Sequence, residues 1–421
     1  MSANEQVFAK CAWRLIPFMV VLYVINYLDR VNVGFASLTM NQDLGISPTA
    51  YGFAGSLFFI GYMLFQVPSA VILERFGARR TVFAILLLWG AISAANALVQ
   101  GETGLYVVRF ALGVAEAGYF PGMIFYLTLW FPKEYRARMI ASFYSGIPLA
   151  FIIGGPVSSL ILQMDGVWGL QGWQWLFIIE GLPACFLAFA ALRLLPDGPQ
   201  QAEWLSAEEK QAIATRLAAD NRAEERSLWP ALLDVRVWAL GMAYAGWQFG
   251  FYGLGLWLPQ IVQAMGFTTL ANGFVTALPF LASIVVMNLW SRSSDTRGER
   301  IWHVAIPALL AASGFAIAGI AESTLVVLLG LTFAASGLVS YMPPFFSLPS
   351  SFLSGTAAAG GIGLVSALGR IGAALGPLVV GALVEATGNY SAAMAAMACG
   401  QLLAAAIVLA MGHMTMRPKP A

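Results

Sequence analysis

The sequence predicts an all-α membrane protein whose twelve membrane-spanning helices form two six-helix bundles. Three observations carry this prediction: the composition, the number of apolar runs and an internal repeat. Of the 421 residues, 59% are hydrophobic and only 10% are charged. Soluble proteins carry about 25% charged residues, and even a large soluble core needs less apolar surface than this. The net charge of +1 gives no indication of a nucleic-acid partner.

Apolar runs of about 20 residues match the thickness of a bilayer and therefore predict its spanning helices. The first run follows Lys10 and Arg14, as in a signal peptide. It continues through Asp29 and Arg30 to about Leu38 without a clear cleavage site, so we expect it to be retained as the first span. The expected spans are 13–38, 50–71, 81–99, 105–130, 139–162, 174–195, 237–263, 272–292, 302–320, 324–347, 357–384 and 391–413.

One long polar segment, residues 196–234, separates the sixth run from the seventh. Within it, residues 202–226 are rich in charge and typical of a surface helix, which we interpret as a solvated linker without chemistry. The expected domains are an N-terminal six-helix bundle at 1–195, a cytoplasmic linker with a surface helix at 196–235, and a C-terminal six-helix bundle at 236–421.

The basic residues indicate the orientation. With twelve spans both termini lie on one side, and the basic residues of the loops and tails gather there, whereas the opposite loops contain no Lys or Arg. Because basic loops stay inside, the sequence predicts cytoplasmic termini. The basic residues are Lys10, Arg14, Arg75, Arg79, Arg80, Lys133, Arg136, Arg138, Arg292, Arg297, Arg300, Arg417 and Lys419, together with those of the central linker.

The two halves of the chain repeat each other at a shift of 221 residues. One unbroken register of such matches over more than 100 residues is hard to obtain by accident. Two parallel six-span repeats are typical of transporters, whose site lies near the middle of the membrane between the halves. The matches include Gly45 with Gly266, Gly52 with Gly273, Gly77 with Gly298, and Gly155-Pro156 with Gly376-Pro377.

The composition offers no metal or redox chemistry. Cys11, Cys185 and Cys399 are widely separated and form no metal, redox or disulfide pattern. His303 and His413 lie near span ends, which does not suggest a zinc site or a catalytic triad. The spans contain no nucleophile–base pair. We therefore expect no metal, no cofactor and no enzymatic activity.

The fourth run carries two opposite charges, Arg109 and Glu116, seven residues apart. On a helix they return to nearly the same face, about 10 Å apart along the axis. Charges in a membrane helix are expensive and normally mark a pathway. One alternative is a structural ion pair between packed helices; the favoured interpretation is ligand or proton handling.

A charged motif joins the second run to the third. It reads Glu74-Arg75-Phe76-Gly77-Ala78-Arg79-Arg80, and residues 295–300 echo it. This motif resembles the cytoplasmic signature of the major facilitator superfamily, with Glu in place of the usual Asp. An acid at a helix end can cap a neighbouring helix and pair with nearby arginines, which would latch the cytoplasmic side shut. The expected gate residues are Glu74, Arg75, Arg79, Asp295 and Arg300.

Six further stretches, at 24–37, 109–122, 129–141, 172–184, 195–210 and 253–259, resemble the anion:cation symporter branch of that superfamily. This branch includes bacterial permeases for phthalate, tartrate, sugar acids and hydroxyphenylacetate. The resemblance implies proton-coupled uptake of an organic carboxylate across the inner membrane by a multi-pass protein, which we expect to be a monomer. The alternative is an organic-anion exchanger or uniporter without proton coupling. Ser158 and Ser159, where an antiporter motif has paired glycines, disfavour drug/proton antiport.

The resemblance also implies roles for residues. Arg30 would hold the substrate carboxylate beside Arg109, Tyr62 would line the site, and Asp29 and Glu116 would couple protons. A guanidinium stays charged in a partly dry cavity and grips a carboxylate with two nitrogens. Burial disfavours an ionised carboxylate while a nearby arginine favours it, so Glu116 near Arg109 can exchange a proton. Asp29 points about 100° away from Arg30, and its alternative role is to bind another helix.

Arg370, in the middle of the eleventh run, departs from the family pattern, which has a neutral polar residue there. A second arginine, one turn from Ser366, suggests a substrate with anionic or strongly polar groups at both ends. Alternatively, Arg370 pairs with a carboxylate such as Glu116 or snorkels. Weaker cavity candidates are Gln248, Trp247 and Tyr144. Aromatic residues in membrane spans more often serve packing. Glu180 in the sixth run is interpreted as structural.

Overall fold

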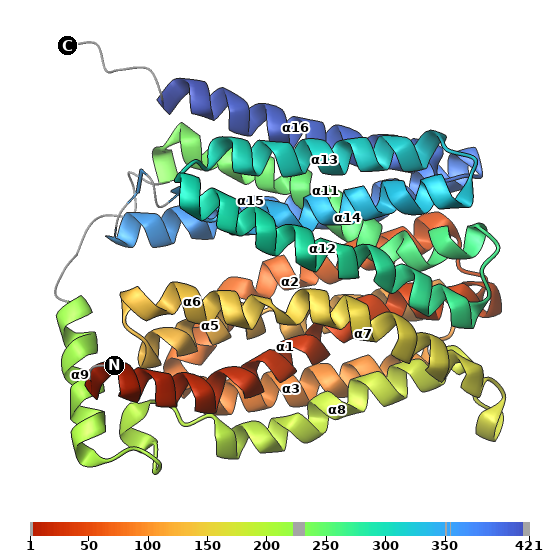
Figure 1. Cartoon of the computed structure of the whole chain (residues 1–421). Helices are drawn as coiled ribbons and strands as arrows, with labels where there is room; N and C mark the ends of the chain where they lie inside the picture. Colours follow the sequence, from red (N-terminus) through yellow and green to blue (C-terminus); the bar gives the residue numbers. More distant parts are fainter. Residues whose placement is uncertain (1–2, 222–231, 350–351, 354, 416–421) are drawn as a thin grey trace.

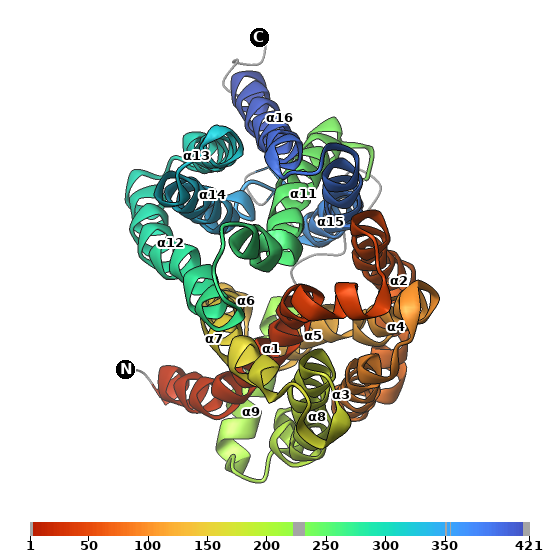
Figure 2. The same cartoon turned by 90° about the vertical axis from the view of Figure 1, so that its right-hand side faces the viewer.

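The computed structural model describes residues 3–221, 232–349, 352–353 and 355–415 of the chain. Within these ranges every regular element is a helix. The helices form two groups, α1–α8 and α11–α16, which lie side by side in both views (Figure 1, Figure 2). The beginning of the first helix and the end of the last helix lie at one end of the molecule (Figure 1), which we call the basic end because the loops rich in Lys and Arg are there. The opposite end is the distal end.

The first group contains two places where an expected span is built from two helices. The run at 105–130 breaks between α4 and α5, directly after Glu116, and the run at 139–162 breaks at Ser145 between α6 and α7. The helices are α1 (Ala3–Leu44), α2 (Pro48–Phe76), α3 (Ala78–Ala95), α4 (Gly101–Glu116), α5 (Tyr119–Trp130), α6 (Lys133–Tyr144), α7 (Gly146–Ile161) and α8 (Gly172–Leu194), with short 3-10 turns at Asn96–Leu98, Leu162–Met164, Val167–Gly169 and Pro199–Gln201.

The second group follows the expected spans helix by helix. Its members are α11 (Val235–Ala264), α12 (Thr269–Arg297), α13 (Ile301–Ile320), α14 (Thr324–Phe345), α15 (Gly355–Thr387) and α16 (Ser391–Thr415). Eleven spans in the described part of the chain are long and apolar enough to cross a membrane, with α4–α5 and α6–α7 each counted as one. The twelfth is α11, whose 30 residues exceed the roughly 20 required. Its hydropathy is lowered by interior tyrosine, tryptophan, glycine and glutamine residues.

The expected surface helix begins five residues later than its charge pattern indicates. α9 (Ala207–Asn221) lies across the basic end of the first group (Figure 1). It starts at a reciprocal cap in which Ser206 and Glu209 bond each other's backbone N–H groups. Ion pairs of 2.8 Å between Lys10 and Glu209 and of 2.7 Å between Arg216 and Glu134 dock it on α1 and α6. Residues 222–226 of the expected helix lie outside the described residues.

The internal repeat places glycines where the two groups cross. A Cβ on Gly52 of α2 would overlap the carbonyl oxygen of Pro377 in α15. At the repeat-related crossing, a Cβ on Gly273 of α12 would overlap the carbonyl oxygen of Gly155 in α7. Both crossings therefore require a residue without a side chain. The same 221-residue shift thus relates the helix pairs α2–α15 and α12–α7 that join the bundles.

Hydrogen bonds join the bundles at the distal end. The backbone N–H of Thr49 donates to Glu385 Oε2 at 2.8 Å. The hydroxyl of Tyr51 donates to the Leu256 carbonyl at 3.2 Å. Gln260 Nε2 donates to Ser37 Oγ at 2.8 Å. These residues close the distal side of the interface in this structure.

Candidate functional site

The central ion pair joins α1 to the end of α4. Arg30 donates from Nε and Nη2 to a single oxygen, Glu116 Oε2, at 3.1 and 2.9 Å. Asn26 Nδ2 donates to the same oxygen at 2.8 Å. Glu116 is fully buried, and its other oxygen, Oε1, has no hydrogen-bond partner among the described residues. Three donors thus converge on one carboxylate oxygen, next to an acceptor that is left unused.

Arg109 is not the partner of Glu116, contrary to the pairing that the sequence suggested. Both residues are buried in α4, but seven residues of helix separate them by about 10 Å, which is too far for direct contact. Arg30 reaches Glu116 from α1 instead. The Arg109 guanidinium lies 5.0 Å from the centre of the Phe58 ring. Its Nη1 is buried without a partner among the residues described here, so Arg109 retains an unused donor.

Asp29 faces away from Arg30, into the first bundle. Trp89 Nε1 of α3 donates to its Oδ2, while Ser93 Oγ and Asn32 Nδ2 donate to its Oδ1 at 2.6 and 3.0 Å. This geometry matches the alternative in which Asp29 binds another helix. Its expected part in proton coupling remains a prediction.

A small cavity separates the bundles beside the ion pair. Arg30, Arg109 and Phe58 line it from the first bundle and Tyr252 from the second. It leaves about 30 Å³ for the centres of water-sized molecules, which is room for about two waters. Tyr27 Oη and Tyr252 Oη, 3.5 Å apart, bridge the two bundles next to it. A carboxylate of several carbons needs a wider separation of the bundles at this level.

Tyr62 lies between two arginines from different bundles. The guanidinium carbons of Arg30 and Arg370 are 5.5 and 4.7 Å from the centre of the Tyr62 ring. The two cations therefore lie no more than about 10 Å apart. Arg370 does not form the alternative pair with Glu116, which binds Arg30. Arg370 Nε and Tyr62 Oη are both buried without a partner in the described part of the structure.

The weaker cavity candidates separate into two kinds. Trp247 is packed: its Nε1 donates to the Leu338 carbonyl at 2.8 Å, and its ring stacks on Tyr244 at 5.4 Å. Tyr144 packs against Tyr23 and other aromatic rings. Gln248 is 1% exposed, and its amide oxygen and nitrogen have no partner among the described residues, so it has free polar atoms to offer a ligand. Ser366 is partly buried, one turn before Arg370.

In the first half of the expected gate, a residue from outside the motif caps α3. The side chain of Glu74 lies outside the described residues. Asp197 accepts a hydrogen bond of 2.7 Å from the backbone N–H of Arg79, at the beginning of α3, and so supplies a negative charge where a helix favours one. No local sequence pattern indicates this contact, because 118 residues separate the two positions. The gate roles of Glu74, Arg75 and Arg79 remain predictions.

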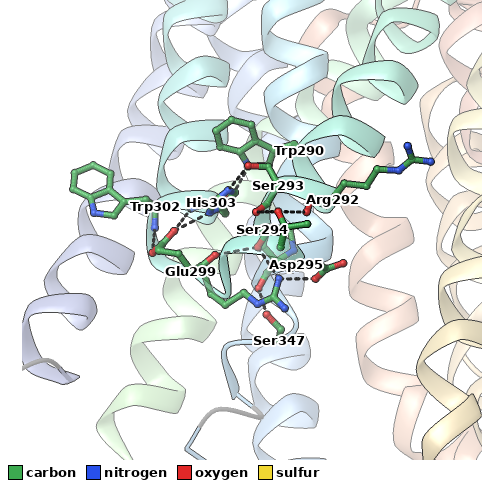
Figure 3. Close-up of polar contacts among 12 residues, drawn as sticks. Trp290, Arg292, Ser293, Ser294, Asp295, Glu299, Trp302, His303 and Ser347 are labelled. Carbon is green, nitrogen blue, oxygen red and sulfur yellow. Dashed lines mark hydrogen bonds and ion pairs between the residues drawn. The ribbon is translucent and has the colours of Figure 1, made fainter.

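The second half of the expected gate is a set of polar contacts within the second bundle, which we call the α12–α13 bracket. Arg300 Nη1 donates to Asp295 Oδ1 at 2.8 Å and to Ser294 Oγ at 2.7 Å. Figure 3 shows Ser294 and Asp295 where α12 turns into α13. The expected acid–arginine pair of this motif is therefore present as an exposed pair, and such pairs contribute little to stability.

His303, which the sequence interpretation left without a role, completes this bracket (Figure 3). Its Nδ1 lies 2.8 Å from Glu299 Oε2 and its Nε2 lies 3.1 Å from Ser293 Oγ. Trp290 Nε1 donates to the His303 carbonyl at 2.8 Å. Glu299 Oε1 accepts from the Trp302 N–H at 2.8 Å and so caps α13. The serine–histidine–glutamate order resembles a hydrolase triad, but the central cavity lies elsewhere, between the bundles.

Comparison with known proteins agrees with the fold. The family model of the Major Facilitator Superfamily matches residues 19–377. The chain belongs to this family and is a multi-pass membrane transporter, not an enzyme.

Relatives in the family carry different names. A putative tartrate transporter of Agrobacterium vitis is 43% identical over 96% of this chain and 91% of its own. A quinolone resistance transporter of Acinetobacter baumannii is 40% identical over 94% and 92%. A bacterial homologue of the human lysosomal transporter Spinster, solved in an inward-facing and occupied conformation, superposes with a TM-score of 0.79 at 16% identity, over 96% of this chain and 98% of that one. This last likeness concerns the fold alone.

Proposed function

We propose that this chain imports an organic carboxylate together with protons across the bacterial inner membrane, with its basic end and both termini in the cytoplasm. The basic residues at that end support this orientation. With the distal end outside, the structure is closed to the exterior, because the hydrogen bonds and glycine crossings between the bundles lie on that side.

The convergence of Arg30 and Asn26 on Glu116 carries the proposal. In this conformation the acid occupies the donors that a substrate carboxylate would use. A proton on Glu116 removes its charge and weakens its hold on Arg30, whose guanidinium can then grip the substrate. Substrate and proton therefore bind together, and loss of both restores the internal ion pair. This exchange couples the two fluxes.

Arg370 supports a substrate with two anionic ends. It lies on the opposite bundle from Arg30, across Tyr62, and has an unpaired buried nitrogen among the described residues. A short dicarboxylate held by both arginines would bridge the bundles and favour their closure around it. The tartrate transporter among the relatives supports a hydroxylated dicarboxylate of this kind.

The test is uptake of radiolabelled tartrate into proteoliposomes. The wild-type protein should accumulate tartrate when an inward proton gradient is imposed without any counter-substrate, which separates symport from exchange. Glu116→Gln should lose this accumulation yet still exchange labelled for unlabelled tartrate, because glutamine cannot ionise to restore the pair with Arg30 that the empty transporter needs in order to return. Glu102→Gln, at the distal beginning of the same helix, is the matched control and should behave as wild type. Accumulation that ignores the proton gradient would favour the exchanger or uniporter.

The dicarboxylate assignment has its own test. In Arg370→Asn, binding of tartrate should weaken about tenfold or more, since a buried ionic hydrogen bond is worth at least about 1.5 kcal/mol. Monocarboxylates such as glycerate should bind as they do to the wild type. Isothermal titration with both ligands measures this discrimination, and an unchanged preference would reject the role of Arg370.

A further inference from the structure

A second buried carboxyl group of the first bundle takes no part in the mechanism above. Glu180 of α8 is 4% exposed, and the Ser158 hydroxyl of α7 donates to its Oε1 at 2.7 Å. Its Oε2 is buried and has no partner among the described residues. The ion pairs found in the described ranges leave Glu180 without a basic partner, in contrast to Glu116, which has Arg30.

Asn32 links Glu180 to Asp29. Its Nδ2 donates to Asp29 Oδ1 at 3.0 Å, and its side chain also interacts with the Glu180 carboxyl group. Trp89 and Ser93 of α3 donate to Asp29. Asn32 is fully buried. One amide of α1 therefore connects two carboxyl groups inside a bundle, with α3, α7 and α8 packed around them.

This cluster has more acceptors than donors. The donors of α1 and α3 are directed at Asp29, and the hydroxyl of Ser158 is directed at Glu180. Glu180 Oε2 and Asn32 Oδ1 then remain buried without a donor from the described residues. An unpaired charge and an unpaired acceptor are both costly in a low-dielectric interior. A proton on Glu180 removes the charge and adds the missing donor.

The charged groups around the cluster act on Asp29 and Glu180 in different ways. From α4, Glu116 and Arg109 act electrostatically on Asp29, but Glu116 is neutralised by Arg30. The thiol of Cys185 in α8 is the other titratable group that senses Asp29. Asp29 is the charged residue that acts on Glu180. Two carboxylates that share one amide disfavour each other's ionised form.

We propose that Asp29, Asn32 and Glu180 form a second proton-binding site, in which Glu180 holds the proton. Glu180 lies eight residues from the distal beginning of α8 and Asp29 lies fifteen from the distal end of α1, which correspond to about 12 and 22 Å. The site thus extends from the distal side towards the level of Arg30, the neighbour of Asp29. It rests on the proposed function: a proton from external water converts the Glu180 carboxylate to the acid, and its release reverses the step.

The number of coupled protons tests this site. At zero membrane potential, the accumulation ratio of tartrate in proteoliposomes rises about tenfold per pH unit of gradient for each coupled proton. The wild type, with protons at Glu116 and Glu180, should show about a hundredfold rise per unit. Glu180→Gln retains the hydrogen-bonding capacity of the side chain but cannot ionise, and should show about a tenfold rise. Tartrate exchange at equal pH should be unchanged.

Asp43→Asn is the matched control. Asp43 also joins α1 to α8, by accepting from Trp173 Nε1 at 2.9 Å, but it lies exposed at the distal end. It should keep the wild-type proton number. Equal proton numbers in the wild type and Glu180→Gln would overturn the second site while leaving the proposed symport intact. A wild-type ratio that ignores the pH gradient would instead overturn the symport. Accumulation driven by a sodium gradient in place of protons would show that the cluster binds a cation.

Infrared spectroscopy of the purified protein gives a test that needs no transport. The wild type and Asp43→Asn at neutral pH should show the carbonyl band of a protonated, buried carboxyl group. Glu180→Gln should lack that band even if it no longer transports. A spectrum in which this band is the same in all three proteins would contradict a protonated Glu180.

Discussion

At the residue scale, the central question is which anion Arg30 holds. Its two nitrogens share one Glu116 oxygen in this structure, and Tyr27, Phe58 and Tyr62 surround its guanidinium at 5.0 to 5.5 Å from the ring centres. The aromatic rings keep water away and stabilise the cation, so an approaching carboxylate meets a charge that is little screened. Arg30 is therefore suited to exchange an internal anion for a substrate.

Arg30→Lys should weaken tartrate binding by at least about tenfold, because lysine keeps the charge but loses the planar two-nitrogen contact. Arg30→Gln should abolish measurable binding, since it also removes the charge. Tryptophan fluorescence titration of the purified proteins measures both effects. Lys210→Gln, on the surface helix α9, serves as the control for the loss of a positive charge. Wild-type affinity in Arg30→Lys would show that geometry does not matter at this position.

The sequence predicts the charged residues of the site but not their partners. Arg30, Arg109, Glu116 and Arg370 stand out because each is a charge inside an apolar run, and the structure buries or partly buries all four. Helical periodicity suggested Arg109 for Glu116, whereas the contact with Arg30 comes from a helix 86 residues away. Contacts between distant segments depend on how helices pack, which a local pattern does not contain.

At the element scale, the glycine crossings control closure of the distal side. Gly273→Val should prevent α12 from approaching α7, because the added side chain would overlap the Gly155 backbone. The variant should favour a conformation that is open at the distal end. Spin labels on α2 and α15 near that end should then report a longer distance than in the wild type. Gly319→Val, within the second bundle, is a control for helix disruption; an unchanged distance in Gly273→Val would contradict the account.

The contribution of the α12–α13 bracket to stability should depend on pH. Partial burial acts to raise the pKa of Glu299, but the Trp302 N–H and the His303 ring outweigh it and hold the pKa below its usual value. A carboxyl group whose pKa is lower in the folded state stabilises the fold above its unfolded pKa, and this stability is lost as the pH falls through the folded value. Glu299→Gln should therefore lower the melting temperature by roughly 1–3 °C at neutral pH.

The same difference in melting temperature should shrink as the pH falls through the lowered pKa of Glu299, and it should disappear once Glu299 is protonated in the wild type as well. Differential scanning fluorimetry across the pH range measures it. Glu322→Gln, in a distal loop, should show no difference at any pH. A deficit in Glu299→Gln that persists in acid would show that packing, not charge, accounts for it.

The positions of the membrane-spanning helices follow closely from the sequence, except for two breaks within spans. Apolar runs predict the spans because a bilayer demands about 20 apolar residues of each. The breaks after Glu116 and at Ser145 were not predicted, since hydropathy averages across them. α11 was predicted as a span from its mostly apolar run, although its tyrosine, tryptophan, glycine and glutamine residues lower its hydropathy.

At the scale of the whole molecule, the two bundles form a pair of repeat-related units that meet at the distal end and at the centre. Arg30 and Glu116 belong to the first bundle and Arg370 to the second. A substrate that binds both arginines would hold the bundles together at mid-membrane, whereas the Arg30–Glu116 pair satisfies the first bundle alone. Rocking between the two access states then depends on which anion Arg30 binds.

The most direct test of this account follows the proton itself. Proteoliposomes held at zero membrane potential, with equal pH on both sides, receive external tartrate while a dye reports the internal pH. The account predicts that tartrate entry acidifies the interior with the wild-type protein and with Glu102→Gln, but not with Arg30→Gln or Glu116→Gln. Tartrate entry without any change of internal pH, or undiminished tartrate accumulation by Arg30→Gln, would contradict it.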